Sequence, residues 1–349
     1  MKTNPVIEIE GRKTGLDYEP LVVAEIGINH GGSLKVAREM VDAAALAGAE
    51  IIKHQTHIVE DEMSRHAEKI KPGNADISIF EIMKNAALSE EEEYELFQYV
   101  KSKGMIFIST PFSRAAAERL ERFNVPAYKI GSGECNNYPL IKHIASYRKP
   151  VIISTGMNTI GSVKTAVDIL RENKIPYALL HCTNIYPTPP ELTRLNALTE
   201  LQQAFPDAVT GLSDHSVTNY PCIAAVALGA SILERHFTDT MKREGPDIIC
   251  SMDVDACREL IRASKIVFAA RGGNKGPVRE EQPTIRFAFA SVVTIRNIRK
   301  SEKFTYDNIW VKRPGTGDIP AADFEKILGK SAKYDIENDT QLKWEMIDE

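Results

Sequence analysis

Residues 21–54 of the chain read LVVAEIGINHGGSLKVAREMVDAAALAGAEIIKH. A β-branched run, LVVAEIG, is followed by a stretch with helical period and then by a second β-branched run, EIIKH. Ser33 stands where an N-cap is expected, and Gly48 stands where the helix should end in the left-handed conformation. This stretch therefore predicts a strand, a crossover helix and a parallel strand.

The same alternation continues to about residue 270. Six further β-branched runs are MIFIS (105–109), AYKIG (127–131), VIIST (151–155), YALLH (177–181), AVTGLS (208–213) and SILERHF (231–237). Ser89 is a second N-cap candidate, and Gly104 and Gly272 are further helix stops. Eight strand and helix pairs over roughly 250 residues predict a (β/α)8 TIM barrel. A doubly wound open sheet is the competing arrangement, but no G-x-G-x-x-G follows the first strand.

A change of composition marks a domain boundary after the barrel. The segment ARGGNKGPVREEQPT (270–284) is rich in Gly, Pro and charge, as linkers are. Beyond it, FASVVTIRNI, IWVKRPG, SAKYDI and QLKWEMI predict short strands. We therefore expect a barrel domain at 1–270, a linker at 271–284 and a small, mainly β domain at 285–349. So small a domain is expected to dock or to dimerise.

Composition excludes several classes of function. The 349 residues carry a net charge of -5, from 43 basic and 48 acidic side chains, without a long basic cluster. This argues against a nucleic-acid or anionic-membrane surface. The longest nearly apolar run, 221–233, is too short to span a bilayer, and the N-terminus lacks an apolar signal core. The five cysteines form no C-x-x-C pair, so we expect free thiols and a soluble, cytoplasmic protein.

Polar residues gather where the predicted strands end, which in such a barrel is where chemistry is assembled. Six of the eight histidines lie at or just beyond strand ends: His30, His54, His57, His181, His215 and His236. A lone histidine there is more often a hydrogen-bonding group than a ligand. His215 and His236, however, follow the seventh and eighth strands and could converge on one divalent ion. The first strand lacks the His-x-His of amidohydrolase-type metallohydrolases.

A second group of residues suggests anion binding. Lys53 and Lys129 lie within strands, where a buried lysine needs an anionic partner. Hydroxyl-rich turns could join them in holding a phosphate and a carboxylate; these are Ser109-Thr110, Ser132-Gly133, Ser154-Thr155-Gly156 and Ser213. Capping of turns is the alternative role at each site. Glu25 and Glu134 could be partners of the lysines or general acids and bases, and spacing does not choose between these roles.

Several long motifs, in order, resemble those of the bacterial N-acetylneuraminate (sialic acid) synthases. They are AEIGINHGGS (24–33), KHQTHIVEDEM (53–63), FISTPFS (107–113), YKIGSGECNNYPLI (128–141), LHCTNIYPTPP (180–190), GLSDHS (211–216), ERHFT (234–238) and GPDIICSM (245–252). KRPGTGD (312–318) is similar to the signature of the antifreeze-like SAF domain that ends these enzymes. Essentially the whole chain is covered by the resemblance.

The resemblance implies a reaction and a set of residues. Phosphoenolpyruvate would condense with open-chain N-acetylmannosamine, with C–O cleavage, to give N-acetylneuraminate and phosphate. His215 and His236 would hold a divalent ion, usually Mn²⁺, with Mg²⁺ or Co²⁺ as alternatives, that polarises the sugar aldehyde. Glu25 and Glu134 would handle protons. The phosphoenolpyruvate contacts would be Lys53, Thr110, Lys129, Ser132, Ser154, Asn184 and Ser213, and Gln55, Tyr186 and Asp247 would line the sugar side.

The resemblance also implies a homodimer with swapped SAF domains. Arg313 of one subunit would contact the N-acetyl group of the sugar in its partner's barrel; the alternative is a solvated charge at a strand end. Asp318 stands where Ile is commoner, and 338–339 stand where a Gly turn is usual, but neither position is a sugar contact. Two other functions stay open: a sibling synthase that takes a diacetamido-6-deoxy sugar to legionaminate or pseudaminate, and an ice-binding or scaffolding protein.

Overall fold

The unit predicted from residues 21–54 is present in the computed structural model, which describes residues 4–71 and 76–348. It consists of β3 (Leu21–Gly27), α1 (Leu34–Ala47) and β4 (Ile51–Thr56). The Ser33 side chain accepts a hydrogen bond from Val36 N, and Gly48 ends α1 with a φ of 89°. The predicted cap and stop of this helix are therefore confirmed. Residues 1–3 and 349, at the outer limits of the predicted domains, lie outside the described residues.

Eight parallel strands close into a barrel in the order β10-β3-β4-β5-β6-β7-β8-β9. The other six are β5 (Ile106–Pro111), β6 (Tyr128–Ile130), β7 (Val151–Ser154), β8 (Tyr177–Cys182), β9 (Val209–Asp214) and β10 (Ile232–His236). Pairing of β10 with β3 closes the sheet, with Ile232 opposite Leu21. All eight predicted strands are confirmed, and the open doubly wound sheet is excluded.

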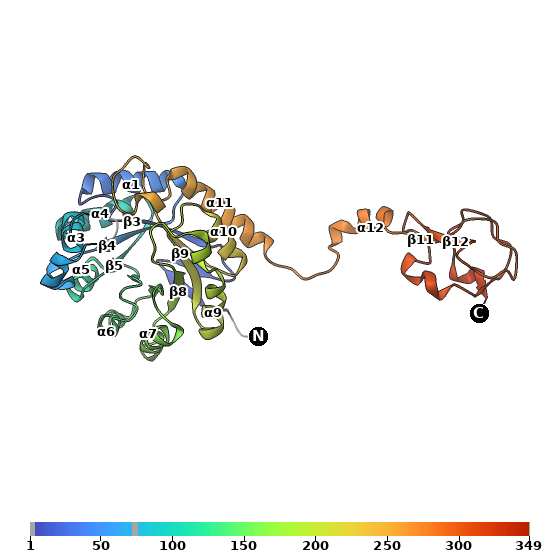
Figure 1. The fold of residues 1–349 in the computed structure, drawn as a ribbon, viewed down its shortest axis with the longest axis horizontal. Coiled ribbons are helices and arrows are strands. Elements are labelled where there is room, and N and C mark those ends of the chain that lie inside the picture. Colours follow the sequence, from blue (N-terminus) through green and yellow to red (C-terminus); the bar gives the residue numbers. More distant parts are fainter. Residues whose placement is uncertain (1–3, 72–75, 349) are drawn as a thin grey trace. The chain divides into compact units, whose positions relative to one another are not determined.

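Helices surround the barrel (Figure 1). The longer ones are α4 (Glu90–Ser102), α5 (Arg114–Phe123), α6 (Tyr138–Ala145), α7 (Ile160–Glu172), α9 (Asn196–Ala204), α10 (Tyr220–Ala227) and α11 (Val254–Ala270). Shorter helices are α2 (Val59–Glu62), α3 (Ile79–Ala86) and α8 (Pro190–Thr193). Gly104 follows α4 with a φ of 74°, as expected. The stop predicted at Gly272 is wrong by one residue, because Gly273 takes the positive φ, of 102°.

A hairpin that the sequence analysis did not predict closes the amino end of the barrel. It consists of β1 (Val6–Ile9) and β2 (Arg12–Gly15), paired antiparallel. Ile7 and Ile9 are fully buried in one cluster with inward-facing residues such as Leu21 and Val23. Apolar packing therefore fills much of this end of the barrel.

Residues 273–349 form a second unit with its own core. Here β11 (Ser291–Thr294) pairs with β12 (Ile309–Lys312), and β13 (Ser331–Ala332) pairs with β14 (Ile347–Asp348). Buried residues such as Val292 and Phe304 hold these short ladders together. Helix α12 (Gln282–Ala288) begins within the segment predicted as a linker, at its last three residues. Much of this unit is irregular between its strands. Nowhere in the described parts of the chain is a helix long and apolar enough to cross a membrane.

Candidate active site

Strand β4 sends alternate side chains to opposite faces of the barrel wall. Lys53 and Gln55 point inward and line the cavity at the carboxyl ends of the strands. Lys53 is 3% exposed. It forms an ion pair with Glu25 of β3 and lies 3.7 Å from Oε1 of Glu234. The ammonium group also donates a hydrogen bond of 3.2 Å to the hydroxyl of Thr110.

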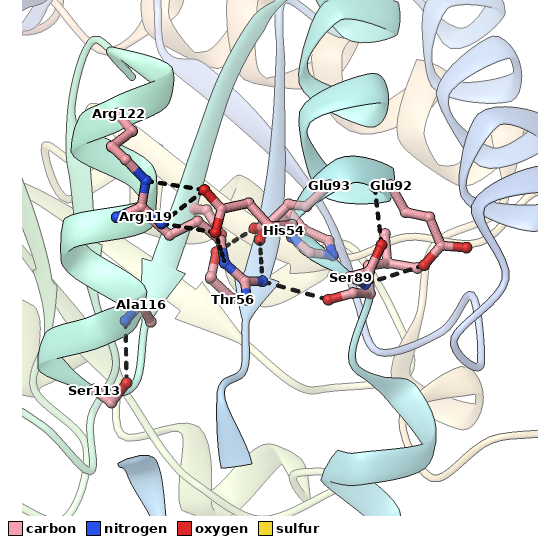
Figure 2. Close-up of polar contacts among 12 residues, drawn as sticks. His54, Thr56, Ser89, Glu92, Glu93, Ser113, Ala116, Arg119 and Arg122 are labelled. Carbon is pink, nitrogen blue, oxygen red and sulfur yellow. Dashed lines mark hydrogen bonds and ion pairs between the residues drawn. The ribbon is translucent and has the colours of Figure 1, made fainter. Parts of the chain in front are cut away.

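The outward face of β4 is held by a buried carboxylate, Glu93 of α4 (Figure 2). His54 Nδ1 lies 3.1 Å from Glu93 Oε1, and the hydroxyl of Thr56 donates to the same oxygen. Arg119 of α5 donates to Glu93 Oε2 at 3.1 Å. Burial acts to raise the pKa of Glu93, but these partners outweigh it and hold the pKa below its usual value. The network fixes β4 to the helical layer, so Lys53 keeps its inward position.

Four of the strand-end histidines serve as hydrogen-bonding groups. His30 Nδ1 accepts from Gly32 N, and its Nε2 lies 3.2 Å from Nε2 of His54. His181 Nε2 lies 2.7 Å from the carbonyl oxygen of Thr193. His57 bonds to neighbouring side chains behind the cavity. His54 therefore belongs to the outer face of β4, although it follows Lys53 directly in sequence.

A second buried lysine lies two strands away from Lys53 in the barrel. Lys129 of β6 donates a hydrogen bond of 2.7 Å to Ser154 Oγ and lies 3.6 Å from Oε1 of Glu234. Burial lowers the pKa of Lys129, and Glu234 offsets this only in part. Burial also acts to lower the pKa of Lys53, but Glu234 and Glu25 outweigh it and raise the pKa above its usual value. The two cations thus differ in how fully the protein compensates their charge.

Glu234 also lines this cavity, although the sequence analysis assigned it no role. It lies on β10, is 6% exposed and approaches both lysines through Oε1, while Oε2 has no hydrogen-bond partner. The signal was available in the sequence, because Glu234 and His236 are two positions apart on one strand and share a face. A carboxylate placed between two lysines compensates part of the cost of burying their positive charges.

One cavity of about 530 Å³ collects the barrel residues predicted for the site. Its lining includes Glu25, Lys53, Gln55, Thr110, Lys129, Ser132, Glu134, Ser154, Asn184, Tyr186, Ser213, His215 and His236. Asp247 lies beside it, with Oδ2 3.7 Å from His236 Nδ1. Gly156 makes room for Asn184, since a Cβ there would lie 1.8 Å from Asn184 Oδ1. Arg313 is exposed on the loop after β12 in the second unit, and its role toward a partner's barrel stays a prediction.

His215 and His236 suit a divalent cation. Their rings lie 5.4 Å apart between centroids. His215 Nδ1 donates to Thr183 O at 2.9 Å, which leaves the Nε2 lone pair for a metal. Burial and the neighbouring His236 lower the pKa of His215 to about 3, so the ring is neutral. His236 Nδ1 is buried without a hydrogen-bond partner. Among the described residues no three His, Cys, Asp or Glu side chains form a metal cluster.

The two candidate acid–base carboxylates have different surroundings. Glu25 accepts a hydrogen bond of 3.0 Å from Gln55 Nε2 and pairs with Lys53. Burial, helped by the negative charge of Glu62, raises the pKa of Glu134 to about 7. Oε2 of Glu134 is buried without a partner. Glu134 is therefore able to exchange a proton near neutral pH.

The closed barrel and its cavity of buried lysines, carboxylates and paired histidines define the chain as a TIM-barrel enzyme. Residues 40–276 match the model of the NeuB family, and residues 289–348 match that of the SAF domain. The chain belongs to the NeuB family and ends in a SAF domain.

Relatives cover nearly the whole chain. An uncharacterised protein of Methanocaldococcus jannaschii is 39% identical, over 97% of this chain and 98% of its own. The N,N'-diacetyllegionaminic acid synthase of Campylobacter jejuni is 34% identical, over 93% of this chain and 98% of its own. The crystal structure of the sialic acid synthetase of Leptospira borgpetersenii, in complex with citrate, superposes with a TM-score of 0.74 at 29% identity, covering 81% of this chain and 95% of that one.

Proposed function

We propose that this enzyme condenses phosphoenolpyruvate with N-acetylmannosamine, with cleavage of the C–O bond, to give N-acetylneuraminate and phosphate. The observation that carries the proposal is the pair of buried lysines, Lys53 and Lys129, in one cavity with the histidine pair. Family membership supports the wider class, the phosphoenolpyruvate-dependent synthases of sialic, legionaminic and pseudaminic acids.

The lysines and the neighbouring hydroxyls would bind phosphoenolpyruvate. Thr110 accepts from Lys53, which also pairs with Glu25, and Ser154 accepts from Lys129, which also donates to the carbonyl oxygen of Ile130. These contacts hold each ammonium in place. The phosphate and the carboxylate would be bound by the remaining ammonium protons, with Ser132, Asn184 and Ser213 around them. Holding the substrate in this way places its weakly nucleophilic C3 against the sugar aldehyde.

His215 and His236 would hold the divalent cation, which we propose to be Mn²⁺, with Mg²⁺ and Co²⁺ as alternatives. Bound there, the cation would polarise the aldehyde oxygen as a Lewis acid. The sugar would lie between this pair and Gln55, with Tyr186 and Asp247 beside it. Tyr186 packs on His215 with 4.0 Å between ring centroids, and this contact supports the proposal that its side chain lines the sugar side of the cavity.

Two carboxylates would serve the proton transfers and the developing charge. Glu134, with its pKa raised to about 7, would exchange a proton with the sugar oxygen or with the attacking water. Glu25 would place negative charge beside the oxocarbenium ion that forms at C2 of phosphoenolpyruvate. Capture of this ion by water and collapse of the hemiketal phosphate then release phosphate.

We propose a homodimer in which Arg313 of the partner subunit contacts the N-acetyl group of the sugar. A second candidate acceptor is a diacetamido-6-deoxy hexose, because the relative from Campylobacter jejuni is named a diacetyllegionaminic acid synthase and is 34% identical.

The deciding experiment is a panel of acceptors assayed with phosphoenolpyruvate and Mn²⁺. Phosphate release and the mass of the product are measured for N-acetylmannosamine and for its 2,4-diacetamido-6-deoxy relatives. We expect the highest kcat/KM with N-acetylmannosamine; a preference for a diacetamido sugar establishes the second candidate. Phosphoenolpyruvate carrying ¹⁸O at the bridging position should deliver its label to phosphate, and label retained in the sugar acid would contradict C–O cleavage.

A further inference from the structure

His57 lies directly behind the wall of the cavity. It follows β4, and its side chain is 1% exposed. The imidazole stacks on Phe112, with 4.5 Å between ring centroids and 12° between planes. Phe112 and Gln55 line the cavity, whereas His57 does not. His57 is therefore placed to act on the site only through its neighbours.

Both ring nitrogens of His57 face hydrogen-bond acceptors. Nδ1 lies 2.8 Å from Glu62 Oε2, and Nε2 lies 3.1 Å from Gln55 Oε1. The amide of Gln55 is oriented by its other end, because Nε2 donates to Glu25 Oε1 at 3.0 Å. A flipped amide would set a carbonyl oxygen against the carboxylate of Glu25. Each ring nitrogen of His57 must therefore carry a proton, which makes the ring an imidazolium.

We propose that His57 is a cationic positioning residue, which aims the Gln55 amide at Glu25 and balances the charge of Glu62 without touching either substrate. The proposal rests on the proposed function, since Glu25 and Gln55 are assigned to that reaction. It explains why an imidazole is buried between an amide oxygen and a carboxylate. A neutral ring could donate to only one of them and would leave the other acceptor unpaired.

The charges around His57 are consistent with a cation there. Glu62 approaches from α2, and Glu25 lies beyond Gln55 with Lys53 behind it. His30, on the loop after β3, adds no competing charge, because burial and His54 lower its pKa to about 3. A cation at His57 would also influence Glu134, because the negative charge of Glu62 helps to raise the pKa of Glu134.

Steady-state kinetics with His57→Gln test the positioning role. Glutamine keeps a polar side chain but is neutral, so we expect kcat to fall about 10- to 100-fold with KM for phosphoenolpyruvate little changed. The limb of the pH profile that reports Glu134 should move to higher pH, since Glu62 is no longer balanced. Adding Glu62→Gln should move that limb back. His143→Gln, at a partly exposed histidine 3.7 Å from Glu118, is the matched control and should leave kinetics unchanged.

A measurement without substrates separates this proposal from the proposed function. ¹⁵N spectra of the histidine rings at pH 7.5, with His57 assigned by the signal missing from His57→Gln, should show protons on both of its nitrogens. A neutral ring overturns the proposal whatever the enzyme's activity. An unchanged kcat and pH profile in a folded His57→Gln protein overturns it too. If the ring is an imidazolium but the protein is inactive with every acceptor, the proposed synthase function is refuted and the positive charge of His57 is still confirmed.

Discussion

Lys129 Nζ donates a hydrogen bond of 2.7 Å to Ser154 Oγ, and neither residue is more than 3% exposed. The two residues come from neighbouring strands, with Lys129 opposite Ile152, two positions before Ser154. The hydroxyl holds the ammonium in place but brings no negative charge, and burial lowers the pKa of this lysine. Glu234 compensates this charge only in part, so an arriving phosphate or carboxylate would add the negative charge that the ammonium still lacks.

Lys129→Met should therefore weaken the binding of phosphoenolpyruvate. Removing one member of a buried charged contact costs about 2 kcal/mol or more, which is at least about a 30-fold rise in Kd. Calorimetric titration with phosphoenolpyruvate measures this. Lys164→Met, at an exposed position of α7, is the control and should bind normally. Unchanged affinity of the folded Lys129→Met protein would contradict the anion-binding role.

His236→Ala should abolish metal binding while the protein stays folded. Loss of an outer-shell partner alone costs roughly 10- to 100-fold in metal affinity, so loss of one of the two ligands that we propose should cost more than about 100-fold. Titration with Mn²⁺ measures the affinity, and melting curves check the fold. His66→Ala removes an exposed histidine and serves as the control. Chelation should likewise stop turnover of the wild-type enzyme, and added Mn²⁺ should restore it.

Glu93→Gln should destabilise the barrel by about 3 kcal/mol at neutral pH, because it leaves Arg119 without its buried anion. Glu93 has a pKa held below its usual value, so its contribution is present above the unfolded-state pKa and is lost as the pH falls through the folded-state pKa. The difference in unfolding free energy between wild type and variant should therefore shrink in acid. Denaturant melts at several pH values measure it, with the exposed Glu91→Gln on the same helix as control.

Glu62→Gln should lower the pKa of Glu134, which burial and the charge of Glu62 raise to about 7. Removing that charge favours the ionised carboxylate, so the limb of the pH–rate profile that reports Glu134 should move to lower pH. Glu60→Gln, on the same short helix but exposed, should leave the profile unchanged. A shift of this limb to higher pH in Glu62→Gln would contradict the conclusion that the charge of Glu62 raises the pKa of Glu134.

The barrel could be predicted from the sequence because each of its strands is a short β-branched run followed by a helical pattern. The hairpin that contains Ile7 and Ile9 was missed, since two four-residue strands carry little pattern and are stabilised by packing under the barrel. The exact strands of the second unit were equally hard to predict, because β13 and β14 have only two residues each.

The cavity was predictable where residue type and strand position coincide, as for Lys53 and Lys129. The sequence could not show which partner a strand-end histidine contacts. His54 turns outward to Glu93, a partner 39 positions away that only the packing of α4 on the barrel brings near. The charge of His57 also depends on the orientation of one amide, which follows from three-dimensional contacts alone.

Mixing two inactive variants tests whether Arg313 acts in the partner's barrel. Arg313→Ala and Glu25→Gln subunits each lack one required group. If Arg313 acts between subunits, each mixed dimer contains one site with neither change. Random exchange makes half of the dimers mixed, so activity should return to about a quarter of the wild-type value. If Arg313 acts within its own subunit, every site in a mixed dimer lacks one group and no activity returns. Differently tagged subunits, purified through both tags, show that exchange has occurred, so an inactive mixed dimer would refute the swap.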